Sequence, residues 1–179
     1  MSTKIQTILL IDGSHYDRLK SVFETPFDLR RLADFVTGGT PPDHAIYYRD
    51  VRDANEDERQ RSLFGWLRHN GFTVKGRTHD RNEPRERYGT NLVEIAVDGL
   101  LLAEPGDHVV LVGGDAKLAP LLSALKEYDI RTTLVSTLGA TATIAPSSLL
   151  LDLADTFIDI ADILPTIALE KPRPRDADA

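Results

Sequence analysis

Short apolar runs alternate with longer stretches of helical periodicity along most of this 179-residue chain. Thr7–Ile11 is a continuous apolar run, typical of a strand that a parallel sheet buries on both faces. Such runs, separated by stretches of helix length, predict a doubly wound α/β/α sandwich with a mainly parallel sheet. The predicted strands are Thr7–Ile11, His44–Tyr48, Phe72–Lys75, His108–Val112, Ile130–Ser136 and Thr156–Ile160, and the predicted helices are Tyr16–Phe23, Leu29–Phe35, Glu56–His69, Asn91–Ala103, Leu118–Tyr128 and Ser147–Ala154.

The chain is expected to form one domain, because it contains neither an internal repeat nor a linker and has ordinary domain length. This domain is predicted to span residues 1–165, followed by a disordered C-terminal tail at residues 166–179. The N-terminal apolar run is too short for a signal peptide, and acids interrupt the apolar stretch Leu92–Ala103. A cytoplasmic protein without a membrane partner is therefore expected.

The composition and the missing motifs exclude several kinds of chemistry. The chain has no cysteine, so any metal must be held by oxygen or imidazole ligands. Its net charge of −7 is unlike that of proteins that coat nucleic acid through bulk charge. The sequence also lacks a G-x-x-x-x-G-K-[ST] phosphate loop, a G-x-G-x-x-G motif after the first strand and a G-x-S-x-G elbow.

Two carboxylates directly follow predicted strands. Asp12 comes after the first apolar run, and Asp115 follows Gly113 and Gly114 after another. In an open parallel sheet both would emerge at the carboxyl edge, where ligands bind at the switch in strand order. Taken singly, each could instead cap the helix that follows it.

Two further acids, Glu94 and Asp98, are spaced i, i+4 on the otherwise apolar helix predicted over Asn91–Ala103. They could simply mark a half-exposed helix face. Converging with Asp12 and Asp115 on one cleft, however, they would form an oxygen ligand set suited to Mg²⁺ or Mn²⁺. A metal held in this way can orient and deprotonate water for attack on a phosphodiester.

Six short motifs occur in order along the chain: Ile11–Ser14, Ile46–Tyr48, Leu67–Val74, Ala96–Asp98, Gly113–Pro120 and Ser148–Phe157. Their order and spacing resemble the NYN domain, a branch of the PIN-like nucleases that includes LabA-like proteins. The resemblance implies a three-layer, Rossmann-like fold and metal-dependent cleavage of RNA. By position it implies that Asp12, Asp98 and Asp115 are the metal-binding acids, with Glu94 assisting.

The acidic motif departs from the family pattern at two places. The family usually reads S-G-D-x-D-F-x-P where this chain has Gly113–Pro120, so that Lys117 replaces the second acid. The family's central helix tends to begin K-x-x-D, but the matching stretch Gly89–Leu92 has no acid. Lys117 could bind the scissile phosphate as a point charge, or it could neutralise Asp115 and disable the site.

Basic residues are enriched before the acid-bearing helix. Residues 49–87 contain ten bases and eight acids, although the whole chain is acidic. Bases close to the predicted cleft could contact the phosphates of RNA, while Tyr88 could stack on a base. A solvated loop with internal salt bridges is the alternative interpretation. The candidate RNA-binding residues are Ser14, Arg77, Arg81, Arg85, Arg87 and Lys117.

The favoured hypothesis is a metal-dependent ribonuclease whose activity is weakened by the eroded motif. The alternative is a non-catalytic module that binds RNA or a protein, with Lys117 filling the former metal site. A small-molecule phosphatase fits less well, because no phosphate loop is present. The sheet edge and the apolar stretch Ile158–Leu169 are also compatible with a homodimer.

Overall fold

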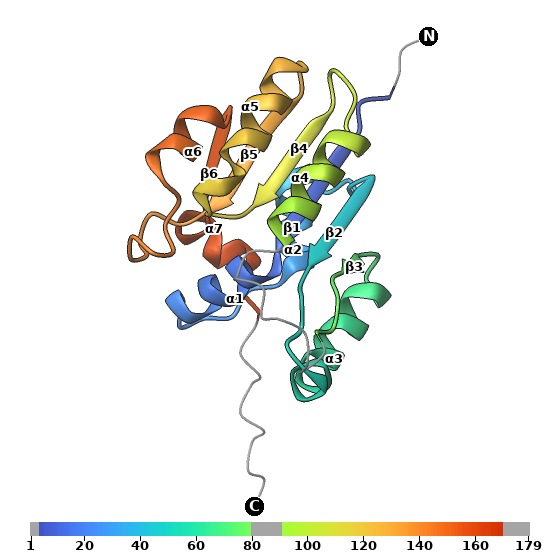
Figure 1. The fold of residues 1–179 in the computed structure, drawn as a ribbon. Coiled ribbons are helices and arrows are strands. Elements are labelled where there is room, and N and C mark those ends of the chain that lie inside the picture. Colours follow the sequence, from blue (N-terminus) through green and yellow to red (C-terminus); the bar gives the residue numbers. More distant parts are fainter. Residues whose placement is uncertain (1–3, 80–90, 170–179) are drawn as a thin grey trace, which may run out of the picture.

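The computed structural model describes residues 4–79 and 91–169, which form a six-stranded parallel sheet (Figure 1). The strand order is β3-β2-β1-β4-β5-β6, and every pairing is parallel. The fold class predicted from the alternation of apolar runs and helices is therefore confirmed. The strands are β1 (Thr7–Asp12), β2 (His44–Tyr48), β3 (Thr73–Lys75), β4 (His108–Val112), β5 (Arg131–Ser136) and β6 (Thr156–Asp159).

Helices cover both faces of this sheet, because alternate strand residues point to opposite sides. In β1, Leu9 and Ile11 belong to one core and Ile8 and Leu10 to the other. One core is completed by α1 (Gly13–Val22), α2 (Leu29–Thr37), α3 (Ala54–His69) and α7 (Ile160–Ile167). The other is completed by α4 (Asn91–Leu102), α5 (Ala119–Glu127), α6 (Ser148–Leu153) and the short 3-10 helix η1 (Ala116–Leu118).

Side-chain caps begin several helices immediately after a strand. Asp12 ends β1 and accepts hydrogen bonds from the first backbone N–H groups of α1, and Asp159 does the same between β6 and α7. Because of its cap, α1 begins at Gly13 rather than at the predicted Tyr16. An Asp at a strand end therefore both terminates the strand and orients the next helix.

The apolar C-terminal stretch serves the chain's own core. Ile160, Ile163 and Ile167 of α7 are buried against the helices on that face, and Ala168 pairs with Phe27. The structure describes the chain as far as Leu169, four residues past the boundary predicted at 165. The rest of the predicted tail, residues 170–179, lies outside the described residues.

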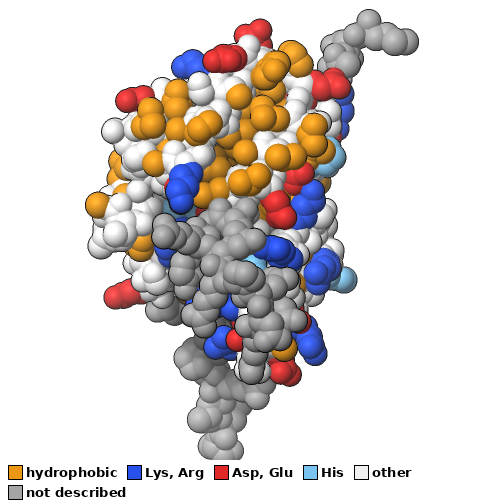
Figure 2. Space-filling view, in the orientation of Figure 1, with side chains coloured by type: hydrophobic (Ala, Val, Ile, Leu, Met, Phe, Trp, Pro, Cys, Tyr) orange, Lys and Arg blue, Asp and Glu red, His pale blue; other side chains and the backbone are white. Residues whose placement is uncertain are grey.

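Apolar side chains also gather on the outer surface of the layer that contains α4 and α5 (Figure 2). On α4, Val93, Val97, Leu100 and Leu101 are exposed, with Leu101 reaching 78%. Within residues 4–79 and 91–169, no helix combines the length and apolarity needed to span a membrane.

Candidate functional site

The two strand-end acids lie at the place where the strand order reverses. From β1 the chain builds outward through β2 to β3 on one side, and from β4 through β5 to β6 on the other. Asp12 is the last residue of β1, and Asp115 caps η1 just beyond β4. The switch point between two such strands is where open parallel sheets bind ligands.

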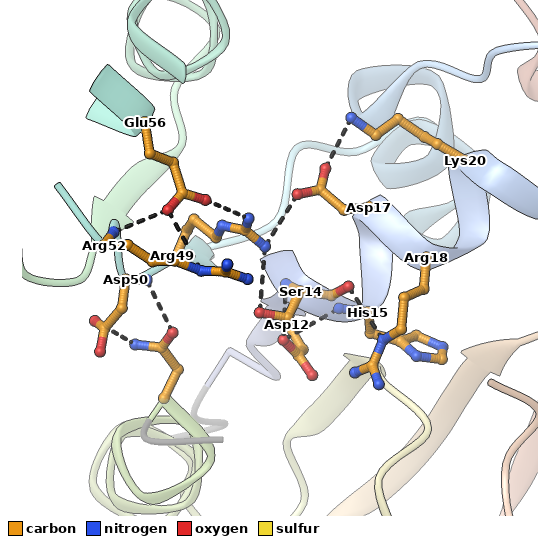
Figure 3. A network of polar contacts seen from close by, with 11 residues as sticks. Asp12, Ser14, His15, Asp17, Arg18, Lys20, Arg49, Asp50, Arg52 and Glu56 are labelled. Atoms are coloured by element: carbon orange, nitrogen blue, oxygen red, sulfur yellow. Dashed lines mark hydrogen bonds and ion pairs between the residues drawn. The ribbon is translucent and has the colours of Figure 1, made fainter. Parts of the chain in front are cut away.

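Asp12 is a buried carboxylate, only 3% exposed. Its Oδ1 accepts hydrogen bonds from the backbone N–H groups of Ser14 (3.0 Å) and His15 (3.3 Å), as Figure 3 shows. Burial raises the pKa of this carboxyl, and the negative charge of Asp115 adds to the rise, while the hydrogen bonds and Arg18 oppose it. A buried acid with a raised pKa at a sheet edge is a candidate functional group.

Close packing brings the Asp115 loop against the first turn of α1. A Cβ added at Gly114 would lie 2.5 Å from His15 Cε1 and 2.9 Å from the Ile144 carbonyl oxygen. Only glycine permits this approach, since neither contact could be relieved without moving the loop. Asp115 itself accepts the backbone N–H of Lys117 at 2.9 Å.

His15 lies buried between the first turn of α1 and the Asp115 loop. It is 1% exposed, and its Nε2 lies 2.9 Å from Ser136 Oγ at the end of β5. Burial lowers the pKa of His15 to about 4, aided by Arg18 and opposed by Asp115. The imidazole is therefore neutral at neutral pH.

Ser14 takes part in a charged network that extends towards α3 (Figure 3). Arg49 Nη1 donates to Ser14 Oγ at 3.3 Å and pairs with Asp17 at 3.0 Å, and its Nη2 pairs with Glu56 at 2.9 Å. Burial disfavours the guanidinium charge, but Asp17 and Glu56 outweigh it and the pKa of Arg49 is raised. The network fixes the Ser14 hydroxyl relative to the end of β2.

Asp98 lies over β2 and β3. Its carboxylate accepts the Tyr48 hydroxyl at 2.6 Å and the Lys75 ammonium at 2.8 and 3.0 Å. Tyr48 and Lys75 are the last residues of β2 and β3. Burial, together with the hydrogen bond to Asp98, raises the pKa of Tyr48. Asp98 is thus held by a cation and a phenol.

The other sequence candidates are more exposed. Glu94 is exposed on the first turn of α4, where its carboxylate accepts a 3.4 Å hydrogen bond from Asn91. The Lys117 side chain is exposed, and among the described residues its ammonium forms no ion pair with Asp115. Arg77 is exposed near the end of β3, and its backbone N–H donates to Asp50. Arg81, Arg85, Arg87 and Tyr88 lie outside the described residues.

The described residues contain no group of three or more His, Asp or Glu side chains arranged to hold a metal ion. Asp12 and Asp115 nevertheless supply two carboxylates, and the charge of Asp115 acts on the pKa of Asp12. Mg²⁺ is often held by only one or two carboxylates, with water and substrate phosphates completing its octahedron. The donor set fits a cation that binds together with a phosphate, rather than a cage formed by protein alone.

Three residues of this region were not singled out as site residues by the motifs: Lys75, Arg49 and His15. Lys75 and Arg49 were only two of many bases, although each stands at or directly after the end of a strand, which was the available signal. His15 showed no metal-ligand spacing. Its contact with Ser136 joins residues 121 apart, which sequence spacing cannot predict.

The comparisons with known proteins agree with this fold. A crystal structure of VPA0982, a protein of unknown function from Vibrio parahaemolyticus RIMD 2210633, is similar with a TM-score of 0.72. The two chains are 23% identical, and the match covers 94% of this chain and 99% of that one. No curated protein matches the sequence. The family model of the NYN domain matches residues 6–163. The chain therefore belongs to the NYN domain family.

Proposed function

We propose that this chain is a metal-dependent ribonuclease that hydrolyses RNA phosphodiesters at the edge between β1 and β4. NYN membership indicates a nuclease-type domain of the PIN-like kind. The observation that carries the proposal is the placement of Asp12 and Asp115 at the strand-order switch, with Asp12 buried and its pKa raised. A buried carboxyl whose pKa is raised, at a sheet edge where ligands bind, is typical of a site that binds a cation or moves a proton.

In this proposal each residue has a separate task. Asp12 and Asp115 would hold the divalent cation, which would act as a Lewis acid and lower the pKa of water. Arg18, whose charge acts on the pKa of both Asp12 and His15, binds a nonbridging phosphate oxygen together with the exposed Lys117. The water oxygen forms a bond to phosphorus and gives up a proton to solvent, while the opposite bond from phosphorus to the ester oxygen breaks and that oxygen takes up a proton from solvent.

Asp98 has a supporting task in the same proposal. Its charge is offset by Lys75, so it contributes little net negative charge as long as that pair persists. Glu94 lies on the first turn of α4 and assists through water. Arg77, with Arg81, Arg85 and Arg87, extends the phosphate-binding surface away from the cleavage position.

A cleavage assay tests the proposal with labelled single-stranded and structured RNA in Mn²⁺, Mg²⁺ or EDTA. Asp12→Asn is expected to reduce metal-dependent cleavage by at least about 100-fold. The matched control is Asp152→Asn, which changes an exposed acid of α6 and is expected to cleave like the natural chain. Equal cleavage by the natural chain and Asp12→Asn would remove Asp12 from the mechanism.

A non-catalytic RNA-binding module is the second candidate, and the Lys75–Asp98 pair favours it. An acid that is already neutralised by a lysine cannot help to concentrate a divalent cation. On this hypothesis RNA binds equally well in Mn²⁺ and EDTA and is not cut. Cleavage by Lys117→Asp, with none by the natural chain, would identify a disabled nuclease.

A further inference from the structure

A half-open pocket of about 480 Å³ adjoins the proposed cleavage site. One side is formed by His15, Arg18, Gly114 and Asp115, and the other by residues 142–147. Asp115 thus belongs to both the pocket and the strand-order switch. A ligand in the pocket would lie immediately beside a phosphate held at that switch.

The far wall of the pocket is fixed by hydrogen bonds within the loop and to its neighbours. The backbone N–H groups of Ile144 and Ala145 both donate to the Thr141 carbonyl at 2.8 Å. Pro146 is buried, and Ser147 caps α6 through the N–H of Leu150. The near wall is fixed by the contact between Gly114 and His15. The pocket is therefore preformed, as small-molecule sites generally are.

The lining combines apolar surface with a few polar groups. The far wall presents Ala142, Ile144, Ala145 and Pro146, whose aliphatic groups suit the face of a flat ring. The near wall presents the carboxylate of Asp115, behind which the buried His15 imidazole is held by Ser136. Arg18 places a cation at the same pocket. A planar group with polar edges, joined to a phosphate, matches this arrangement.

We infer that this pocket receives one unpaired nucleobase of the RNA, next to the phosphate that is cut. This inference rests on the proposed function, because the base enters the pocket as part of that substrate. Asp115 accepts hydrogen bonds from the polar edge of the base, Arg18 lies beside its phosphate, and the apolar wall packs on its face. A base that is paired and stacked in a helix offers neither its face nor its pairing edge, so the pocket selects single-stranded segments.

Nucleoside 5′-monophosphates test the inference directly, and ribose 5-phosphate serves as the ligand without a base. Binding is followed by NMR titration of the full chain in EDTA, so that neither metal nor cleavage is required. At least one of AMP, GMP, CMP and UMP is expected to bind about five- to 150-fold more tightly than ribose 5-phosphate, the range for burying one stacked base. Shifted amide signals are expected at Gly114 and in the 142–147 loop.

Two variants fill the pocket from its far wall. Ala145→Phe and, at an exposed position, Ala142→Trp are each expected to abolish the preference for nucleotides over ribose 5-phosphate. Ala161→Phe, on the exposed surface of α7, is the matched control and is expected to retain that preference. A thermal melt shows which variants are folded, and Ala142→Trp decides the matter if Ala145→Phe does not fold.

Equal binding of nucleotides and ribose 5-phosphate by the natural chain would overturn the inference, as would unchanged preference in a folded pocket variant. These outcomes are distinct from failure of the proposed function. A chain that binds nucleotides in this pocket but never cuts RNA retains the base site and loses the nuclease assignment. A chain that cuts RNA with no base preference in binding retains the nuclease assignment and loses the base site.

Discussion

Protonation of His15 is predicted to make the fold strongly sensitive to acid. The pKa of this histidine is about 4 in the folded chain, against 6.5 in an unfolded one. Above pH 6.5 both states are neutral, and between pH 6.5 and 4 only the unfolded chain takes up the proton. The free energy of unfolding should therefore fall by about 3 kcal/mol across this window. For a chain of this length that loss lowers Tm by roughly 6 to 12 °C.

Urea unfolding at a series of pH values from 7.5 to 4.5 measures this contribution against His15→Gln, which keeps a hydrogen-bonding group towards Ser136. The variant should lose less stability on acidification than the natural chain, by most of that 3 kcal/mol. His69→Gln, at an exposed histidine that ends α3, controls for the removal of a histidine in general. Parallel pH profiles for His15→Gln and the natural chain would refute the reasoning, as would an NMR titration of His15 with a midpoint near 6.5.

Substitutions at three site positions, Asp12, Gly13 and Lys75, give further tests. Asp12→Asn should stabilise the chain by about 0.5–2 kcal/mol at pH 7, as measured by thermal melts, because an amide can still cap α1 but buries no charge. Asp12→Ala should stabilise the chain less, because it also loses the cap. Because burial raises the pKa of Asp12, the stability that Asp12→Asn gains over the natural chain should shrink as the pH falls towards 3.8. An unchanged difference in stability at that pH would contradict this account. Gly13→Ala should lower the free energy of unfolding in urea by about 1–3 kcal/mol, because its Cβ would lie 2.5 Å from the Tyr48 carbonyl oxygen. Gly65→Ala in α3 is the control: its Cβ would meet open space, so the free energy of unfolding should rise by up to about 1 kcal/mol. Lys75→Ala should free Asp98 and tighten Mn²⁺ binding in a spin-resonance titration, and unchanged binding would show that Asp98 is remote from the cation.

The sheet and its site edge could be predicted from the sequence because they depend on local signals. Each buried strand is a short apolar run, and an Asp after a strand reaches the carboxyl edge in any parallel arrangement. Asp12 and Asp115 follow from that rule alone. The cap formed by Asp12 was also predictable, but the predicted helix began at Tyr16 rather than directly after the cap, at Gly13.

The environment of Asp98 could not be predicted in this way. The i, i+4 spacing with Glu94 places both acids on one face of α4, but it does not say which strand that face overlies. The rotation and position of α4 depend on packing against Leu10 and Leu121, which closely approach Gly99. Those contacts are long-range in sequence. Similarly, α7 was not predicted, because Pro165 lies inside the helix and Ile160 was assigned to the preceding strand, although Ile160, Ile163 and Ile167 recur at helical spacing.

Ion pairs are distributed unevenly along the carboxyl edge of the sheet. On the β2 and β3 side, acids are matched by cations: Asp98 by Lys75, Glu56 by Arg49, and Asp50 by His79 whenever that histidine is protonated. At the switch between β1 and β4, by contrast, neither Asp12 nor Asp115 forms an ion pair with any described residue. Burial is the main cause of the raised pKa of Asp12, the charge of Asp115 adds to the rise, and the charge of Arg18 opposes it. Under the proposed function, a cation bound by Asp12 and Asp115 would offset both charges there, whereas the acids beside β2 and β3 already have cationic partners.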